Sequence, residues 1–334
     1  MEVTKKLRRF MRKTEFYLLI ILVAVCIAIQ IISGGQLFEA NTIVDIARSM
    51  IIFGMFALIN LMVVISGGFD LSFPTLASLT YSAVATITLE MGWGQESAWI
   101  AILLAGVIGL LLGMVNGFII SRFKLNTMIV TLGTQTLFLG ISMGLFQFRE
   151  ITSKLPQGLK NFGEDWLFEV FSSAGLRSAM PSVFLMFVVL AVLVWFILKR
   201  TMFGRSLYAI GGNEVSAERT GINVKSTKFW LYAFVGLVAG IVGITRVCMV
   251  QQSIPKALNG WDLKVIPAVI LGGASIYGGE GSVFGTLIAV TLMTVISNSL
   301  LLIGIGSIWQ DFFNGLVILV SVAVSAVQAK RRSI

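Results

Sequence analysis

The chain has 334 residues, of which 57% are hydrophobic and only 12% are charged. Soluble domains carry about 25% charged residues, so this composition and a mean hydropathy of +0.92 exclude an ordinary soluble protein. The net charge of +9 comes from basic residues at the ends of apolar runs, which favours membrane topology over nucleic-acid binding as its cause. The sequence has no histidine, and its two cysteines lie far apart inside apolar runs. We therefore predict one membrane domain, residues 1–334, with no catalytic, metal or cofactor site.

Ten runs without a charged residue are candidates for membrane-spanning helices. Most reach the roughly 20 residues that a helix needs to cross a bilayer. The first follows basic residues, as in a signal peptide, but it is too long for a signal core and is interpreted as an uncleaved helix. We predict an all-α integral membrane protein with about ten transmembrane helices, at 16–38, 49–69, 71–89, 97–121, 125–148, 178–198, 229–245, 265–279, 281–310 and 312–329. The run at 265–279 is short, so it is either a full span or part of a broken helix.

Lysines and arginines predict the orientation, because they concentrate in cytoplasmic segments. With ten helices and the N-terminus inside, 17 of the 25 basic residues fall on the inner side. This places segment 1–15 and the long loop 199–228 in the cytoplasm, together with the C-terminus. The loop 149–177 is then extracytoplasmic, and within it we expect a short amphipathic helix near 166–171.

The segment 66–74 combines glycines, an acid and a proline between two predicted spans. Gly67 and Gly68 can end one helix, because glycine tolerates the left-handed conformation found there. Asp70 can cap the next helix, and Pro74 is acceptable in a first turn. One interpretation is a simple turn between two helices. The other is a helix broken at membrane depth, with Asp70 as an intramembrane acid that serves transport.

A second motif predicts a short, self-contained helix inside the loop 199–228. Asn213 is a candidate N-cap, Glu214 suits the positive N-terminal end, and Gly221 can end the helix. An isolated helix of this length is only marginally stable in water. It is therefore either an ordinary solvated loop helix or an element that docks on a partner protein, with the small Ala217 allowing close approach.

A third motif is the glycine-rich block 272–282. It lacks the Lys-Ser or Lys-Thr pair that a P-loop requires, and no P-loop occurs elsewhere in the chain. The block therefore predicts a tight turn between helices, and any ATP that drives this protein must be hydrolysed by another chain. Residues 64–68 and 269–273 resemble each other, which is consistent with an internal repeat but also with the chance recurrence of apolar Gly-Gly tracts.

Several amides and hydroxyls lie inside the predicted spans. Each buried amide needs hydrogen-bond partners, and bonds between neighbouring helices would supply them. The alternative is that some of these groups line a path for a polar solute. The candidates for such a path or its gate are Asp70, Asn60, Asn116, Gln135 and Asn298.

Three blocks of the sequence resemble the ribose-type permeases of the ABC superfamily, and the resemblance extends from residue 42 to 327. Residues 67–72, Gly-Gly-Phe-Asp-Leu-Ser, are similar to a turn of that family. Residues 203–213, with Ala217 and 221–224, resemble its cytoplasmic coupling segment. Residues 269–275, with 278–279 and 281–286, resemble its late glycine-rich block.

The resemblance implies the permease subunit of an ATP-driven importer in the bacterial inner membrane, with no covalent chemistry of its own. The cargo would be a pentose, a hexose or a related polar solute; a quorum-sensing furanosyl compound and a nucleoside are alternatives, and an ion-coupled secondary transporter is a competing class. The implied partners are a cytoplasmic ABC ATPase, an extracytoplasmic solute-binding protein, a second permease copy (identical or paralogous) and membrane lipid, without nucleic acid. The residues implied in ATPase coupling are Gly212, Asn213, Glu214, Ala217, Gly221 and Ile222.

Overall fold

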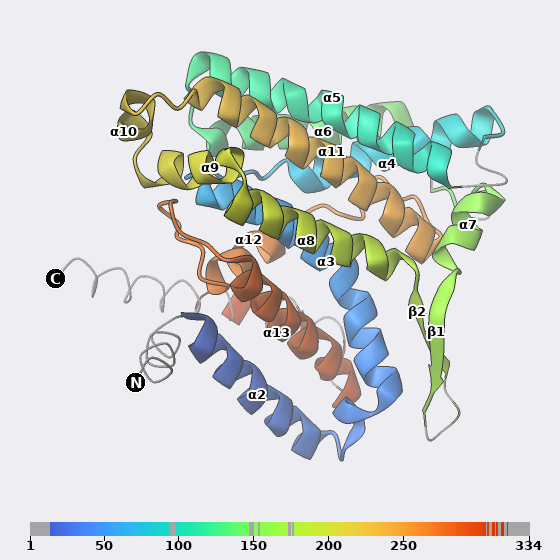
Figure 1. The fold of residues 1–334 in the computed structure, drawn as a ribbon. Helices are drawn as coiled ribbons and strands as arrows, with labels where there is room; N and C mark the ends of the chain where they lie inside the picture. Colours follow the sequence, from blue (N-terminus) through green and yellow to red (C-terminus); the bar gives the residue numbers. More distant parts are fainter. Residues whose placement is uncertain are drawn as a thin grey trace, which may run out of the picture.

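The computed structural model describes residues 14–304, except 94–97, 147–149, 153, 173, 174 and 176, together with a few positions between 306 and 319. The described chain forms a bundle of helices with one small β-hairpin (Figure 1). The elements in chain order are α2 (Thr14–Ile32), η1 (Gln36–Phe38), α3 (Ala40–Ile65), α4 (Phe73–Glu90), α5 (Trp99–Phe123), α6 (Thr127–Phe146), α7 (Gln157–Gly163), β1 (Trp166–Phe171), β2 (Arg177–Pro181), α8 (Val183–Arg200), α9 (Met202–Gly212), α10 (Glu214–Arg219), α11 (Val224–Val250), α12 (Asp262–Leu271) and α13 (Val283–Leu302).

Seven helices in the described part of the chain are long and apolar enough to cross a membrane: α2, α3, α5, α6, α8, α11 and α13. The prediction of a helical membrane protein with many spans is therefore confirmed. The predicted count of about ten is not. The runs at 71–89 and 265–279 correspond to α4 and to the ten-residue α12, which do not meet the same criteria. The run at 312–329 lies mostly outside the described residues.

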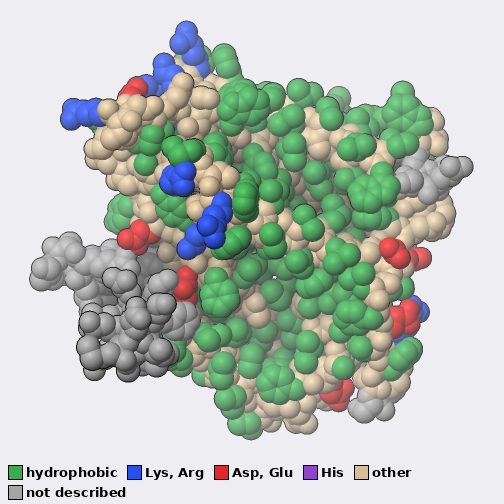
Figure 2. All heavy atoms as spheres, in the orientation of Figure 1, with side chains coloured by type: hydrophobic (Ala, Val, Ile, Leu, Met, Phe, Trp, Pro, Cys, Tyr) green, Lys and Arg blue, Asp and Glu red, His purple; other side chains and the backbone are tan. Residues whose placement is uncertain are grey.

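The bundle has two distinct ends. Helices α9 and α10 lie at one end with the beginning of α2, and the hairpin and α7 lie at the opposite end (Figure 1). On the face drawn in Figure 2, apolar side chains cover the middle of the molecule, and most of the visible lysines and arginines gather near α9 and α10. We call this the α9 end. A broad apolar surface with basic groups at one end is the pattern expected for a protein that crosses a bilayer.

The prediction of an amphipathic helix near 166–171 is wrong, because this segment is strand β1. It pairs antiparallel with β2, from Trp166 opposite Pro181 to Phe171 opposite Arg177. Aromatic and β-branched residues dominate β1, and these residues favour strands. Gly175, with a φ of +78°, lies in the connection between the two strands.

Glycines bring α5 and α11 into close contact along most of their length. A Cβ atom on Gly236 would lie 2.4 Å from the carbonyl oxygen of Gly109 and 2.5 Å from the Cα of Gly113. A Cβ atom on Gly240 would lie 2.3 Å from the carbonyl oxygen of Ala105. Small residues that let backbones approach are the usual basis of helix association in membranes. We therefore expect α5 and α11 to pack as one unit of the bundle.

Helices α4 and α12 both begin inside the bundle, beside the middle of α3. The Phe56 ring of α3 lies 5.1 Å from the ring of Phe73, at the start of α4, and 6.1 Å from the ring of Trp261, just before α12. Phe56 precedes the end of α3 by nine residues, which is about 13 Å of helix. The short run at 265–279 is therefore not one full span, because α12 is a half-length helix that follows a nonhelical segment.

Helices α3 and α12 end in the same way. Both place a glycine in the left-handed conformation just past the last turn, Gly67 with a φ of +77° and Gly273 with a φ of +93°. In each, paired backbone bonds close the end in a Schellman motif: Gly68 N–H to Val63 O, Gly67 N–H to Val64 O, Ala274 N–H to Val269 O and Gly273 N–H to Ile270 O. The resemblance between 64–68 and 269–273 thus has a structural counterpart, although the equivalent glycines are shifted by one residue from the sequence match.

Candidate functional site

The short helix predicted after Asn213 is present as α10. The Asn213 carboxamide oxygen accepts a hydrogen bond from the Ser216 backbone N–H at 2.8 Å, as an N-cap should. Gly221 has a φ of +89° and follows the last turn. Glu214 in the first turn pairs with Lys228 of α11 at 2.6 Å. The cap and the ion pair fix the orientation of α10 relative to α11.

Ala217 and Val215 lie on opposite sides of α10. Ala217 is only 4% exposed and packs with Ile210 of α9 and Val224 of α11. The small side chain therefore allows α10 to approach its own chain, and it is not available to an outside partner in this structure. Val215 is 60% exposed and presents an apolar side chain at the tip of the loop.

The three sequence blocks that carry the family resemblance meet at one point. A Cβ atom on Gly211 of α9 would lie 1.9 Å from the Ile65 carbonyl oxygen at the end of α3. A Cβ atom on Gly278 would lie 2.6 Å from the Cα of Gly67. The Gly279 N–H donates to that same Ile65 oxygen at 2.9 Å. A side chain at Gly211 or Gly278 would overlap backbone atoms, and Gly67, Gly278 and Gly279 have the positive φ that favours glycine. We call this contact of Gly67, Gly211, Gly278 and Gly279 the glycine junction.

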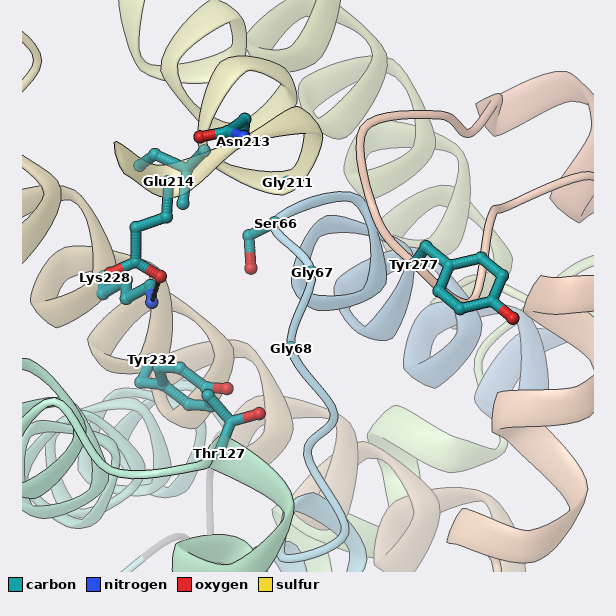
Figure 3. Close-up of a pocket in the computed structure, with 11 residues that line it drawn as sticks. Ser66, Gly67, Gly68, Thr127, Gly211, Asn213, Glu214, Lys228, Tyr232 and Tyr277 are labelled. Atoms are coloured by element: carbon teal, nitrogen blue, oxygen red, sulfur yellow. Dashed lines mark hydrogen bonds and ion pairs between the residues drawn. The ribbon is translucent and has the colours of Figure 1, made fainter. Parts of the chain in front are cut away.

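A polar pocket of about 210 Å³ opens beside the glycine junction. Figure 3 shows the chain running through Gly67 and Gly68, with Tyr232 and Thr127 on one side and the Tyr277 ring on the other. The Thr127 hydroxyl accepts from the Phe69 N–H at 2.9 Å. Helix α6 therefore holds the segment that follows α3. The residues that line the pocket are Ser66, Gly67, Gly68, Thr127, Ile210, Gly211, Asn213, Glu214, Lys228, Tyr232 and Tyr277.

Asp70 belongs to a buried polar network with three other side chains. One of its carboxylate oxygens accepts from the Ser72 N–H at 2.8 Å and from the Ser72 hydroxyl at 2.7 Å. The Asn116 amide of α5 donates to the Ser72 hydroxyl at 2.7 Å, and the Asn60 amide of α3 donates to the Asp70 backbone oxygen at 3.3 Å. Because Asn60 lies five residues before the end of α3, the segment 66–72 turns back into the bundle by about 7.5 Å.

This geometry favours the broken-helix interpretation of the Asp70 segment. Asn60 and Asn116, two of the candidate path residues, donate their hydrogen bonds to the nonhelical segment 66–72 and not to a neighbouring helix. Both are at most 1% exposed, and neither lines one of the pockets described in this section.

The other two candidate path residues are not part of this network. Gln135 of α6 donates to the Asp262 carboxylate in the first turn of α12 at 3.3 Å. Asn298 of α13 lines a separate pocket of about 200 Å³, together with Ser49, Phe53, Trp261, Lys264, Met293, Thr294, Ser297 and Gln310. The structure thus brings together Asp70, Asn60 and Asn116, and it separates them from Asn298.

The sequence did not predict the contacts of several residues that shape this site. Tyr208 of α9 donates its hydroxyl to the Gly281 backbone oxygen at 2.9 Å, which ties α9 to the late glycine-rich block. Burial raises the pKa of Tyr208, so the hydroxyl keeps its proton. Gly211, like Tyr208, lies in the predicted coupling segment 203–213, but its backbone contact was not predicted, and Thr127 was not singled out. The three glycine pairs were visible in the sequence, but nothing in it indicated that they touch.

Substitution of Asp70 tests whether the network needs its charge or only its oxygen. We expect Asp70→Ala to destabilise the protein by about 1 to 3 kcal/mol, because it leaves buried Ser72 donors without a partner. Asp70→Asn keeps an acceptor oxygen and should express at the wild-type level. The measurement is thermal unfolding of the purified variants, and equal stability of Asp70→Ala and wild type would contradict this account of the network.

Comparison with known proteins agrees with this architecture. Residues 42–322 match the family model described as "Branched-chain amino acid transport system / permease component". Proteins of this class move a solute across the membrane and hydrolyse no ATP themselves. The chain belongs to this family of ABC transport permeases.

Several curated relatives match nearly the whole chain. The ribose import permease of Escherichia coli strain K12 is 30% identical over 306 residues, which is 91% of this chain and 92% of the relative. The ribose import permease of Bacillus subtilis strain 168 is 32% identical and covers 87% of this chain and 86% of the relative. The fructose import permease of Rhizobium meliloti is 28% identical over 96% of this chain and 88% of the relative. No solved structure matches the chain.

Family membership establishes the class of activity. The protein is the membrane subunit of an ABC importer and not an enzyme, and ATP hydrolysis belongs to a separate chain. With its apolar helices, it is a multi-pass protein of the inner membrane. The family also implies an ATPase subunit and a solute-binding protein as partners.

Proposed function

We propose that this chain is the path through which an ABC importer brings a simple sugar, a pentose or a hexose, into the cell. The observation that carries the proposal is the whole-length similarity to permeases named for ribose and for fructose. The family model is named for branched-chain amino acids, but the relatives that match over nearly their full length include permeases named for ribose and for fructose.

Uptake by cells that contain the complete importer tests the cargo class. The permease is co-expressed with its ATPase and its binding protein, and entry of labelled D-ribose, D-fructose and L-leucine is compared. We expect uptake of one of the two sugars and none of leucine. Uptake of leucine alone would contradict the proposal and would favour the amino-acid class.

The α9 end is proposed to face the cytoplasm and to receive the ATPase. The coupling segment would comprise Gly212, Asn213, Glu214, Ala217, Gly221 and Ile222. Its exposed apolar contact would be Val215, because Ala217 packs inward. Closure of the ATPase would move α10 and α9, and alternating access would follow. The buried network around Asp70 would position the broken segment, with Gln135 and Asn298 as candidate contacts of the cargo.

The complete permease would have ten spans, both termini in the cytoplasm and a second permease copy, identical or paralogous, beside it in the lipid bilayer. The seven apolar helices, the helices α4 and α12, and the apolar run at 312–329 would together make ten. An even number returns the chain to the side where it began.

Reporter fusions test this topology. Gly158 lies in α7 at one end of the bundle, and Asn213 lies between α9 and α10 at the other. A reporter active only outside the cytoplasm should therefore be active after Gly158 and inactive after Asn213. Activity at both positions, or at neither, would contradict the proposed orientation.

A further inference from the structure

A small apolar cluster lies apart from the main hydrophobic core, between the segment that follows α3 and helix α12. Leu71, Ile266 and Ile270 are each less than 9% exposed, and the partly buried Phe69 and Ile276 pack against them. We call these five residues the apolar cluster. Such a cluster blocks a hydrated polar solute, because hydroxyl groups lose their hydrogen bonds to water on entering it.

A polar pair borders the apolar cluster on the side away from the α9 end. Asp262 precedes Ile266 by four residues, so both lie on the same face of α12. Asp262 accepts its hydrogen bond from Gln135 of α6. A solute that moves toward the α9 end would therefore leave carboxylate and amide groups and meet the apolar cluster next.

Both chain segments that supply the nonhelical residues of the cluster pass through the glycine junction. Phe69 and Leu71 lie two and four residues after Gly67, in the nonhelical segment before α4. Ile276 stands two residues before Gly278 in the connection between α12 and α13. A displacement of the junction must therefore displace residues of the cluster, since a single residue separates Gly67 from Phe69 and Gly278 from Ile276.

Helix α9 takes part in the glycine junction through the backbone of Gly211. Because Gly211 has no side chain, its backbone lies against the backbones of Ile65 and Gly279. Groups packed this closely transmit displacement to one another. Tyr208 adds a hydrogen bond from α9 to Gly281 on the same connection. The coupling segment α10 continues from α9 after a single residue, Asn213.

We propose that the apolar cluster is the cytoplasmic gate of the permease and that the glycine junction is the contact by which the coupling segment opens it. Gly67, Gly211 and Gly278 are then positioning residues, which act on the gate without touching the cargo. This inference rests on the proposed function, because it needs an ATPase that moves α10.

The junction is tested by adding one methyl group to Gly211. Reconstituted importer is compared as wild type, Gly211→Ala and Gly144→Ala, since a Cβ atom on Gly144 would meet nothing within 4 Å. ATPase co-purification and sugar uptake are measured for each. We expect Gly211→Ala to bind the ATPase but to lose uptake by at least about tenfold, because overpacking at a closed contact shifts its equilibrium. Equal uptake by the two variants overturns the proposal.

A second variant, which changes the packing less, tests the junction if Gly211→Ala fails to fold. Tyr208→Phe removes one hydrogen bond at constant shape, and we expect it to raise the number of ATP molecules hydrolysed per sugar by about threefold to tenfold. A merely structural role would leave this ratio unchanged, and an unchanged ratio overturns the proposal.

The gate is tested by measuring how fast sugar leaks through the permease when no ATP is present. Vesicles loaded with the labelled sugar that the wild type transports, D-ribose or D-fructose, are followed without ATP. Leu71→Ala should release the sugar at least about tenfold faster than Leu263→Ala, whose side chain is exposed on α12. Equal release overturns the gate assignment. Wild-type uptake, measured first, separates the two proposals: if it is absent the proposed function fails, and if it is present a negative result concerns the gate alone.

Discussion

Replacing Val215 with Asp is expected to separate the permease from its ATPase while the membrane bundle stays folded. Val215 is 60% exposed at the tip of α10, so the new carboxylate is solvated in the free permease. In the assembled importer it would be buried without a partner, which costs several kcal/mol. The affinity for the ATPase should fall by at least about a hundredfold.

Co-purification of the ATPase with each permease variant is the measurement. Glu218→Gln is the matched control, because it changes the charge of the same helix by one unit at an exposed position whose ion pair with Lys124 spans 3.7 Å. Such surface pairs contribute little to stability. Normal assembly of Val215→Asp would show that α10 is a solvated loop helix and that the ATPase docks elsewhere.

Ala217 requires a different expectation. An arginine there would disrupt the contact of α10 with Ile210 and Val224 before any partner is involved. Loss of assembly by Ala217→Arg would therefore not distinguish docking from local unfolding, and Val215 is the sharper probe.

Replacing Gly236 with Ala is expected to destabilise the bundle itself. The added Cβ atom would lie 2.4 Å from the Gly109 oxygen and 2.5 Å from the Gly113 Cα, and backbone atoms of a rigid helix cannot move aside. Overpacking of this kind costs about 1 to 3 kcal/mol or more, a large part of the stability of most proteins.

Yield and thermal unfolding in detergent measure this effect. Gly106→Ala is the matched control on the same pair of helices, because its Cβ atom would meet only the Ile241 side chain, at 3.6 Å. This variant should fold as well as the wild type. Equal stability of Gly236→Ala and Gly106→Ala would contradict the close approach of α5 and α11.

Periodic and compositional signals predicted the local features of this fold well. The apolar runs located seven spans, because a bilayer demands about 20 uncharged residues whatever surrounds them. The capped helix after Asn213 was predicted for a similarly local reason: its N-cap and the glycine at Gly221 lie within a few residues of one another.

Long-range contacts account for what the sequence could not predict. The contact of Gly67, Gly211 and Gly278 joins segments more than 60 residues apart. A Gly-Gly pair looks the same in the sequence whether it ends a helix or contacts the backbone of another segment. The half-length α12 was ambiguous because the uncharged run 265–279 continues past the end of the helix at Leu271, through a turn that carries no charge. In the 166–171 segment, pairing with a second strand decided the structure.

ATP-driven uptake by purified components tests the central claim most directly. Vesicles containing the permease and its ATPase, with ATP inside and the binding protein outside, are supplied with labelled D-ribose or D-fructose. The account predicts accumulation of one of these sugars above its outside concentration, lost when ATP or the binding protein is omitted. Failure to accumulate either sugar under these conditions would contradict it.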